Sequence, residues 1–405
     1  MKKVMMMAMM LVATATAFAG DSDALKAVMK SKSYAEAAQL LKTNLGQMAD
    51  DAEKAKAYNH LVDLAMQKVS NETGTIAENQ AALQLGTGKQ KEYDTIALAD
   101  GVCEAIEAAI ECNKYDQLPN AKGKIAPKFA EKNAQRIWQV RSHLVNVGQE
   151  AAKNSKADLV LKYWGAFTDS GADPFFAAMD HNSEKEYAGQ VAYFAGRYAF
   201  DAKDMQRAMK YLDIAMQDET QKADALNFKL YAMRSSLKSR EDSLNCINQF
   251  KELYAQDPTN EVVLDGLYSM YDGLKMKEEQ KALLDNHLAK YPDSFTATAE
   301  KGMMAISENN AEEGANWLRK ACALKPDNAV VQTYLGTCLN VIAGNTDDAA
   351  KRKAVFEEAV QALDKAKELD PDKAQANWGY NRYQAYYGLY GEEDPKTKAA
   401  EADIR

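Results

Sequence analysis

Proline is scarce in this chain, with 8 among 405 residues, whereas alanine, leucine, glutamate and lysine are abundant. Because proline interrupts helices and these four residues favour them, the composition predicts an all-α protein. Basic residues are in deficit too. The 50 basic residues less Lys2 and Lys3 leave 48 against 59 acidic ones, a net charge of −11 for the rest of the chain. This charge repels a phosphate backbone, so we expect no nucleic-acid partner.

Histidine is rarer still, and no histidine has a second histidine or a cysteine three or four residues away. That spacing is typical of a metal site on a helix, so we predict no metal. The Gly-Thr-Gly-Lys segment at 86–89 has one residue between its glycines, where a phosphate loop has four, and it predicts a plain loop. Adjacent carboxylates such as Glu312 and Glu313 fit a solvated helix face. We therefore expect neither a cofactor nor a catalytic site.

Cysteine occurs five times, an odd number that leaves at least one thiol unpaired. Cys103 and Cys112 are nine residues apart, which places them on opposite faces of one helix and prevents a disulfide between them. Cys322 and Cys338 fall on successive predicted helices. Two alternatives stay open for that pair, a disulfide or buried free thiols.

The first nineteen residues have the pattern of a secretory signal peptide. Lys2 and Lys3 precede a short apolar run at 4–12, and small residues surround Phe18 before Gly20. The run is too short to span a membrane, and no cysteine stands at the cleavage point as lipid attachment requires. We expect cleavage near Ala19-Gly20 and a periplasmic or secreted bacterial protein that is not an integral membrane protein.

The prolines reveal a repeat. Pro258, Pro292 and Pro326 are 34 residues apart, and Pro371 follows after 45, one period plus eleven. Each proline ends a predicted helix, and the eleven extra residues fall near 343–353. The same slots recur before each proline. Eight residues upstream stand Phe250, Leu284, Leu318 and Leu363, and five upstream stand Leu253, His287, Ala321 and Ala366.

These slots resemble the tetratricopeptide repeat, whose signature has a Leu-Gly pair in the first helix and Ala, Phe, Ala and Pro through the second. Arg234, Gln280 and His287 depart from the pattern, because small residues are expected at those slots. The resemblance implies antiparallel helix pairs stacked into an α-solenoid. The residues that carry it most clearly are Leu335, Gly336, Ala359, Leu363, Ala366 and Pro371.

The period divides the chain into parts. Residues 1–19 are the signal peptide, 20–170 an irregular or repeat-like helical domain, 171–226 a degenerate helix pair, 227–373 the repeat array, and 374–405 a capping helix and tail. Residues 144–167, which contain Gly148 and Trp164, give a further possible unit. Residues 70–128 do not fit the period, and they predict helices at 77–85 and 96–112.

The resemblance also implies a concave binding surface, lined by the first helix of each pair. The lining is hydroxyl-rich and mildly acidic, which suits a neutral or basic segment or a hydroxylated ligand. Tyr231 and Ser235 stand where the family's chaperone-binding members use lysine and asparagine to hold a terminal carboxylate, so we do not expect that clamp. The full predicted set is Tyr231, Ser235, Asp265, Ser269, Asp272, Met303, Thr333, Thr337 and Asn340.

A tyrosine cluster follows the array. Tyr380, Tyr383, Tyr387 and Tyr390 fall within an arc of about 80° at helical pitch. Two interpretations remain open: an apolar stripe that covers the end of the solenoid, or an aromatic platform for a partner or a sugar ring.

The sequence therefore predicts a non-catalytic scaffold of the bacterial cell envelope that binds a protein or peptide. One alternative is a glycan-binding protein of a polysaccharide-uptake system, which would use the tyrosines. Surface glycan binders of the starch-uptake type are built on such repeats, but they are longer and lipid-anchored. A helical-repeat enzyme is the third alternative, and no acid pair or metal site supports it.

Overall fold

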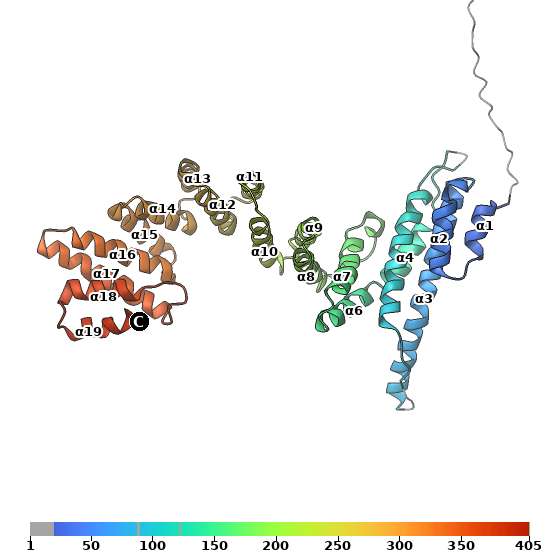
Figure 1. Cartoon of the computed structure of the whole chain (residues 1–405), viewed down its shortest axis with the longest axis horizontal. Helices are drawn as coiled ribbons and strands as arrows, with labels where there is room; N and C mark the ends of the chain where they lie inside the picture. The colour runs from blue at the N-terminus through green and yellow to red at the C-terminus, as the bar shows by residue number, and fades with distance from the viewer. Residues whose placement is uncertain (1–19, 87–89, 121–122, 405) are drawn as a thin grey trace, which may run out of the picture. The chain divides into compact units, whose positions relative to one another are not determined.

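The computed structural model describes residues 20–86, 90–120 and 123–404, and every regular element in them is a helix (Figure 1). The predicted signal peptide and Thr87 to Lys89 of the glycine loop lie outside these residues. No helix in the described ranges is long and apolar enough to cross a membrane. The chain divides into two compact units, with the boundary between Lys229 and Leu230. The all-α prediction is confirmed.

Unit 1 begins with two helix pairs of different length. The first pair is short, and the second is formed by the long helices α3 and α4, which pack along one another. A single helix and two further pairs follow. The helices of unit 1 are α1 (Asp23–Lys30), α2 (Tyr34–Asn44), α3 (Asp51–Leu85), α4 (Thr95–Asp116), α5 (Ala130–Trp138), α6 (Ser142–Lys153), α7 (Ala157–Gly171), α8 (Ala188–Asp201) and α9 (Met205–Ala215), with short 3₁₀ turns η1 (Leu45–Gln47), η2 (Pro174–Phe176) and η3 (His181–Glu184).

Unit 2 contains the regular repeats. Helix α10 (Lys222–Ser235) contains the boundary between the two units. The remaining helices are α11 (Arg240–Gln256), α12 (Glu261–Gly273), α13 (Lys277–Lys290), α14 (Phe295–Ser307), α15 (Ala311–Leu324), α16 (Ala329–Gly344), α17 (Ala349–Leu369), α18 (Gly379–Tyr390) and α19 (Pro395–Glu401), followed by η4 (Ala402–Ile404). Helix α12 packs on α14, α14 on α16, and α16 on α18, so the first helices of successive pairs lie side by side. Within unit 2 this is the stacking of an α-solenoid.

The four predicted prolines each follow the end of a helix, as expected. Helices α11, α13, α15 and α17 all stop two residues before their proline. The residue between has left the helical conformation, with ψ between 65° and 84°, and its N–H still donates to the carbonyl four residues back. These carbonyls belong to Leu253, His287, Ala321 and Ala366, the slots five residues upstream of the prolines.

The eleven extra residues lengthen both helices of one pair. Helix α16 has 16 residues against 13 in α14, and α17 has 21 against 14 in α15. The loop between α16 and α17 has one residue more than the corresponding loop between α14 and α15. Together these three differences account for the whole insertion.

A small residue lets the two helices of a pair approach closely. A Cβ on Gly336 of α16 would lie 2.4 Å from Leu363 of α17, and a Cβ on Gly302 of α14 would lie 2.7 Å from Leu318 of α15. Both leucines are fully buried. The same contact joins Gly148 of α6 to Trp164 of α7, at 2.4 Å, so residues 144–167 do form a helix pair. A larger residue at these glycines would overpack the contact.

The turn inside a pair has a second shared feature. Four such turns contain a non-glycine residue in the left-handed region, with φ between 55° and 62°. In each turn the next residue donates its N–H to a carbonyl five residues back, at 2.9 Å, the bonding of a Schellman motif. The left-handed residues are Ser155, Lys203, Lys275 and Asn309.

The predicted helices at 77–85 and 96–112 are parts of longer ones. The first is the end of the 35-residue α3, which no proline interrupts, and which Gly86 terminates in the left-handed conformation at φ 63°. The Asn79 side chain of α3 donates to the carbonyl of Lys91 and accepts from its N–H. These two hydrogen bonds hold Lys91, in the connection between α3 and α4, against α3. All five cysteines have free thiols, and four are buried, which decides the alternatives for Cys322 and Cys338.

We predict that Lys275→Gly stabilises the protein. Lysine is strained at φ 58°, whereas glycine adopts that conformation freely, so the free energy of unfolding should rise by up to about 1 kcal/mol. Lys281→Gly is the matched control, because Lys281 is exposed in the middle of α13, where glycine costs about 0.5–1 kcal/mol. Urea unfolding, monitored by circular dichroism, measures the free energy of unfolding of both variants. A loss of stability in Lys275→Gly would contradict the assigned turn.

Candidate functional site

The predicted concave residues lie on four helices, from α10 to α16. Tyr231 and Ser235 are exposed on α10, and the Ser235 hydroxyl donates to the Tyr231 carbonyl at 2.8 Å. Met303 is half-buried on α14. The other predicted residues fall into two groups. Asp265, Ser269 and Asp272 are exposed on α12, and Thr333, Thr337 and Asn340 belong to α16.

Thr333 is a correction to the predicted set. Its side chain is only 6% exposed, and its hydroxyl donates to the Ala329 carbonyl at 2.8 Å. A partner cannot reach it, because the stacking of helices covers this position in the longest repeat. Thr337, one turn further along α16, is half-buried and donates to the Thr333 carbonyl.

An open groove of about 760 Å³ lies beside the end of α16, and it joins the two predicted sites. Thr337 and Asn340 of the concave set line one side. Tyr380, Tyr383 and Tyr387 of the tyrosine cluster line the other. Phe356 of α17 and Val341 of α16 complete the apolar part, and Asn381, Gln384, Gly388 and Glu392 the remainder. The sequence analysis did not identify Phe356 as a groove residue. Its position in α17, next to the predicted insertion, is the feature of the sequence that could have indicated it.

The tyrosines remain accessible in this groove. Tyr380 is 54% exposed and Tyr387 is 48% exposed, while Tyr383 is half-buried with its ring centre 6.0 Å from that of Tyr387. Tyr390 is exposed as well but stacks on Tyr386 instead of lining the groove. Helix α18 does pack on α16 and α17, but its buried residues are Gly379, Ala385 and Tyr386. The stripe of four tyrosines is therefore not the face that covers the solenoid.

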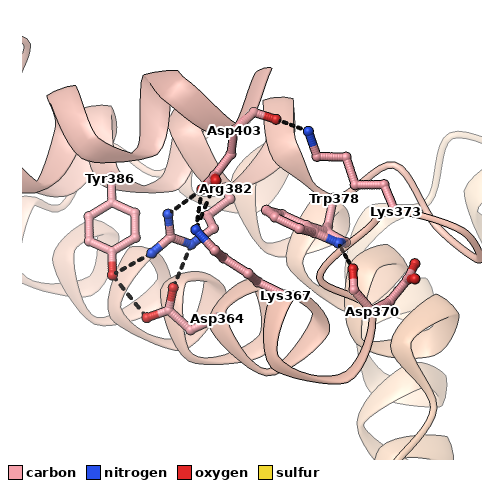
Figure 2. Close-up of polar contacts among 8 residues, drawn as sticks. All are labelled: Asp364, Lys367, Asp370, Lys373, Trp378, Arg382, Tyr386 and Asp403. Carbon is pink, nitrogen blue, oxygen red and sulfur yellow. Dashed lines mark hydrogen bonds and ion pairs between the residues drawn. The ribbon is translucent and has the colours of Figure 1, made fainter. Parts of the chain in front are cut away.

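Polar contacts behind α18 fix its position (Figure 2). The Arg382 guanidinium donates to Asp364 of α17 and to Asp403 of η4, each at 2.7 Å. The Tyr386 hydroxyl donates to the second oxygen of Asp364 at 2.9 Å. Burial and then this hydrogen bond raise the pKa of Tyr386 to about 12, so the hydroxyl keeps its proton. Arg382 thus joins three elements of the chain end.

The start of α18 is held in the same way. The Trp378 indole is fully buried and donates to the Asp370 carbonyl at 2.8 Å. Lys367 and Lys373 both donate to Asp403, the first to its carboxylate and the second to its carbonyl (Figure 2). None of these residues lines the groove, so the contacts hold helix α18 in place without occupying the groove.

Asn340 connects the two sides of the groove. Its side-chain N–H donates to the Asn381 carbonyl at 2.8 Å, which links α16 to α18. Its side-chain oxygen is buried and has no hydrogen-bond partner among the described residues. The sequence indicated Asn340 as a surface contact, and the structure adds that it also fixes the width of the groove.

A second surface forms where α12 faces α14. Asp265 and Asp272, both predicted, approach Glu300 of α14, which sequence reasoning missed although it lies one turn from Met303. Glu300 forms a hydrogen bond with Tyr268. Burial, and then the nearby charge of Asp265, raise the pKa of Glu300 to about 7. This acidic surface therefore gains a negative charge as the pH rises through neutrality.

The described residues contain no group of three histidine, cysteine, aspartate or glutamate side chains that could hold a metal ion. The histidine at the small-residue slot, His287, is buried and hydrogen-bonded to the Tyr254 hydroxyl at 2.7 Å. Burial lowers its pKa, so it is neutral at physiological pH. Its role is packing between α11 and α13.

No protein-family model matches the chain, and no curated protein matches it. Similar solved structures include a tetratricopeptide-repeat protein of Thermus thermophilus, at 15% identity and a TM-score of 0.32 over 50% of this chain and 99% of that one. MamA of Desulfovibrio magneticus RS-1 has 16% identity and a TM-score of 0.30 over 46% and 97%. Yeast Tom70 has 13% identity and a TM-score of 0.35 over 92% and 80%.

Identities and TM-scores this low carry no inference about activity or partners. The chain's own helix pairs define its fold: a 34-residue stride, a glycine against a buried leucine inside three of the pairs (Gly196 against Leu212 is the third), and first helices that stack side by side in unit 2. The helix pairs of unit 2 form an α-solenoid that is like an array of tetratricopeptide repeats. The groove beside α18 thus lies at the end of this repeat array.

We predict that Glu300→Gln changes how stability depends on pH. The folded-state pKa of Glu300, about 7, exceeds its ordinary value of 4.5, so the folded protein retains a proton that the unfolded chain has lost. This contribution is present below about pH 4.5 and disappears as the pH rises through 7. Glutamine stays neutral, so the variant should exceed the wild type in stability at about pH 8 and lose most of that advantage at about pH 5.

Urea unfolding at the two pH values measures the difference. Glu312→Gln serves as the control, because Glu312 is exposed on α15 and should leave the pH dependence of the wild type unchanged. Equal stability of Glu300→Gln and the wild type at both pH values would contradict the burial of Glu300 beside Asp265.

Proposed function

We propose that this tetratricopeptide-repeat protein is a non-catalytic scaffold that binds a segment of a protein partner in the groove beside α18. The observation that carries the proposal is the set of accessible tyrosine rings on a helix that is fixed from behind. Because the helix that carries the rings is already fixed, binding orders only their side chains, so their contact area contributes to affinity at a smaller entropic cost. The contacts of Arg382 with Asp364 and Asp403 supply this rigidity.

The groove chemistry suits a peptide. Phe356 and the three tyrosine rings offer apolar contact, while Thr337, Asn381 and Gln384 offer hydroxyl, amide and carbonyl groups that match a peptide backbone. Among the described residues, Glu392 is the one charged member of the lining. A neutral or basic segment therefore fits the groove better than an acidic one.

Glycan binding is the second candidate, because the exposed tyrosines could stack on sugar rings. Their arrangement favours it less. The rings of Tyr383 and Tyr387 are tilted by 40° to one another, with centres 6.0 Å apart, so the pair does not form one flat platform. A peptide side chain can enter the angle between two tilted rings, whereas a sugar ring stacks on a flat face.

We predict that Tyr387→Ala weakens partner capture at least tenfold, because it removes a ring of the groove. Crosslinking and pull-down from an envelope extract of the source bacterium measure the captured protein. Tyr93→Ala is the matched control, since Tyr93 is 42% exposed but belongs to unit 1. Equal capture by Tyr387→Ala and Tyr93→Ala would contradict the groove as the binding site. Retention on an immobilised polysaccharide panel that Tyr387→Ala abolishes would establish the glycan alternative instead.

We also propose that the protein acts in the cell envelope or outside the cell. The support is the sequence pattern of residues 1–19, with two lysines, a short apolar run and small residues before Gly20. Expression of the full chain in a bacterium, followed by fractionation and N-terminal sequencing, tests this. We expect the product in the periplasm or medium, beginning at Gly20. An uncleaved product that starts at Met1 in the cytoplasm would contradict export.

A further inference from the structure

Basic residues gather where α4 connects to α5 in unit 1. We call residues 117–120 and 123–132, which cover this connection and the first turn of α5, the basic segment. Its residues up to Lys128 are all exposed to solvent, and they include Leu118 at 43% and Ile125 at 60%. The groove beside α18 belongs to unit 2, so the basic segment forms no part of it.

A tight turn brings the two exposed apolar residues onto adjacent stretches of chain. The Gly123 N–H donates to the Asn120 carbonyl at 2.8 Å, and the Asn120 N–H donates to the Lys124 carbonyl at 2.9 Å. Leu118 lies two residues before these bonds and Ile125 one residue after them. Both residues therefore leave the same end of the turn, with Lys124 next to Ile125.

Three lysines of the basic segment are exposed, and none forms an ion pair within the described part of the chain. Lys124 belongs to the turn, while Lys128 and Lys132 line a pocket of about 340 Å³ at the start of α5. The basic residues on either side are different, because Lys114 pairs with Glu111 and Arg136 pairs with Asp63. The three lysines are thus available to an anion outside the protein.

Nearby carboxylates leave this positive charge largely uncompensated. Asp116 is 9% exposed, and its carboxylate accepts hydrogen bonds from the backbone N–H groups of residues 128–130, so it caps the approach to α5. Glu131 is exposed and accepts a hydrogen bond from the Gln135 side chain. Three lysines and Glu131 give the basic segment a net charge of +2, in a chain whose net charge is −9.

Lysines beside exposed apolar side chains match an anionic membrane surface. Anionic headgroups attract each nearby lysine by about fivefold in affinity, and the boundary between headgroups and acyl chains accepts apolar side chains. An acidic protein is the other possible occupant. The observations favour the membrane, because Leu118 and Ile125 project from an exposed turn. A membrane accepts such a projection at any point, whereas a protein partner needs a cavity of matching shape.

We propose that the basic segment docks this protein on a membrane surface rich in anionic phospholipid. Lys124, Lys128 and Lys132 contact the headgroup phosphates, and Ile125 and Leu118 enter the boundary between headgroups and acyl chains. The acidic remainder of the protein is repelled by the same surface, so the contact is confined to the basic segment. Docking is peripheral and reversible, because a few lysines and two apolar side chains form a weak anchor.

Sedimentation with sucrose-loaded vesicles tests the proposal. The chain from Gly20 onward contains every described residue, and its use excludes lipid binding by the apolar run at 4–12. One set of vesicles contains equal parts of phosphatidylglycerol and phosphatidylcholine, and the other contains phosphatidylcholine alone. We expect at least tenfold stronger binding to the anionic vesicles in about 50 mM salt. Most of this difference should disappear in about 500 mM salt, which screens the charges.

Replacing the three lysines tests their part in binding. The combined variant Lys124→Gln, Lys128→Gln and Lys132→Gln should bind the anionic vesicles at least tenfold more weakly than the wild type. A matched control changes the net charge equally on α13 of unit 2, and it should bind like the wild type. This control replaces with glutamine the three exposed lysines Lys277, Lys281 and Lys290.

Replacing Ile125 tests the apolar contact. Ile125→Ser should weaken binding to the anionic vesicles at least threefold, because it removes the most exposed apolar side chain of the segment. Leu83→Ser is the matched control, since Leu83 also belongs to unit 1 and is 64% exposed. The variants of the basic segment should keep the wild-type melting temperature, because the replaced side chains are exposed.

Three results would overturn the proposal: equal binding to the two kinds of vesicle, equal loss of binding in the two triple-lysine variants, or no binding to the anionic vesicles. If the third result came with crosslinks from Lys128 to an acidic protein, the basic segment would be assigned to a protein partner instead.

Discussion

The close approach of two helices at a glycine is the constraint on which the rest of this structure depends. Gly336 against Leu363 and Gly302 against Leu318 leave no room for a Cβ, so each pair closes around one buried leucine. A closed pair still exposes an apolar side, and the next pair covers it. The strained left-handed turns and the proline-terminated helices follow from this need, because they set where one helix stops and the next begins.

The last pair shows what happens at the end of the array. Helix α18 is held by charge pairs and a buried indole, through Arg382, Asp403 and Trp378 (Figure 2). Its other face would be covered within an array, and here it keeps its tyrosines accessible. The lengthened α16 and α17 bring Asn340 and Phe356 beside them. Thus an insertion within the array and a cap after it together form a groove that no single repeat contains.

Two open sites of this chain differ in how they are built. The groove beside α18 relies on exposed rings and has one charged residue in its described lining, whereas the pocket at the end of α7 in unit 1 is lined by two basic and four acidic side chains. The wide apolar contact of the groove suits a partner segment. The acidic surface around Glu300 adds sensitivity to pH near neutrality, since burial beside Asp265 moves its titration into that range.

The sequence by itself determined the helix pairs, because proline spacing, buried leucine slots and small residues act locally and repeat at 34 residues. It also indicated Asn340, Thr337 and the tyrosines as contact residues, although as members of two separate sites. Only the tertiary structure placed them in one groove, buried Thr333 and brought Glu300 to Asp265. Periodicity fixes which face of a helix is apolar. Packing between residues far apart in the chain decides which neighbouring helix buries that face, and which part of it stays exposed to solvent.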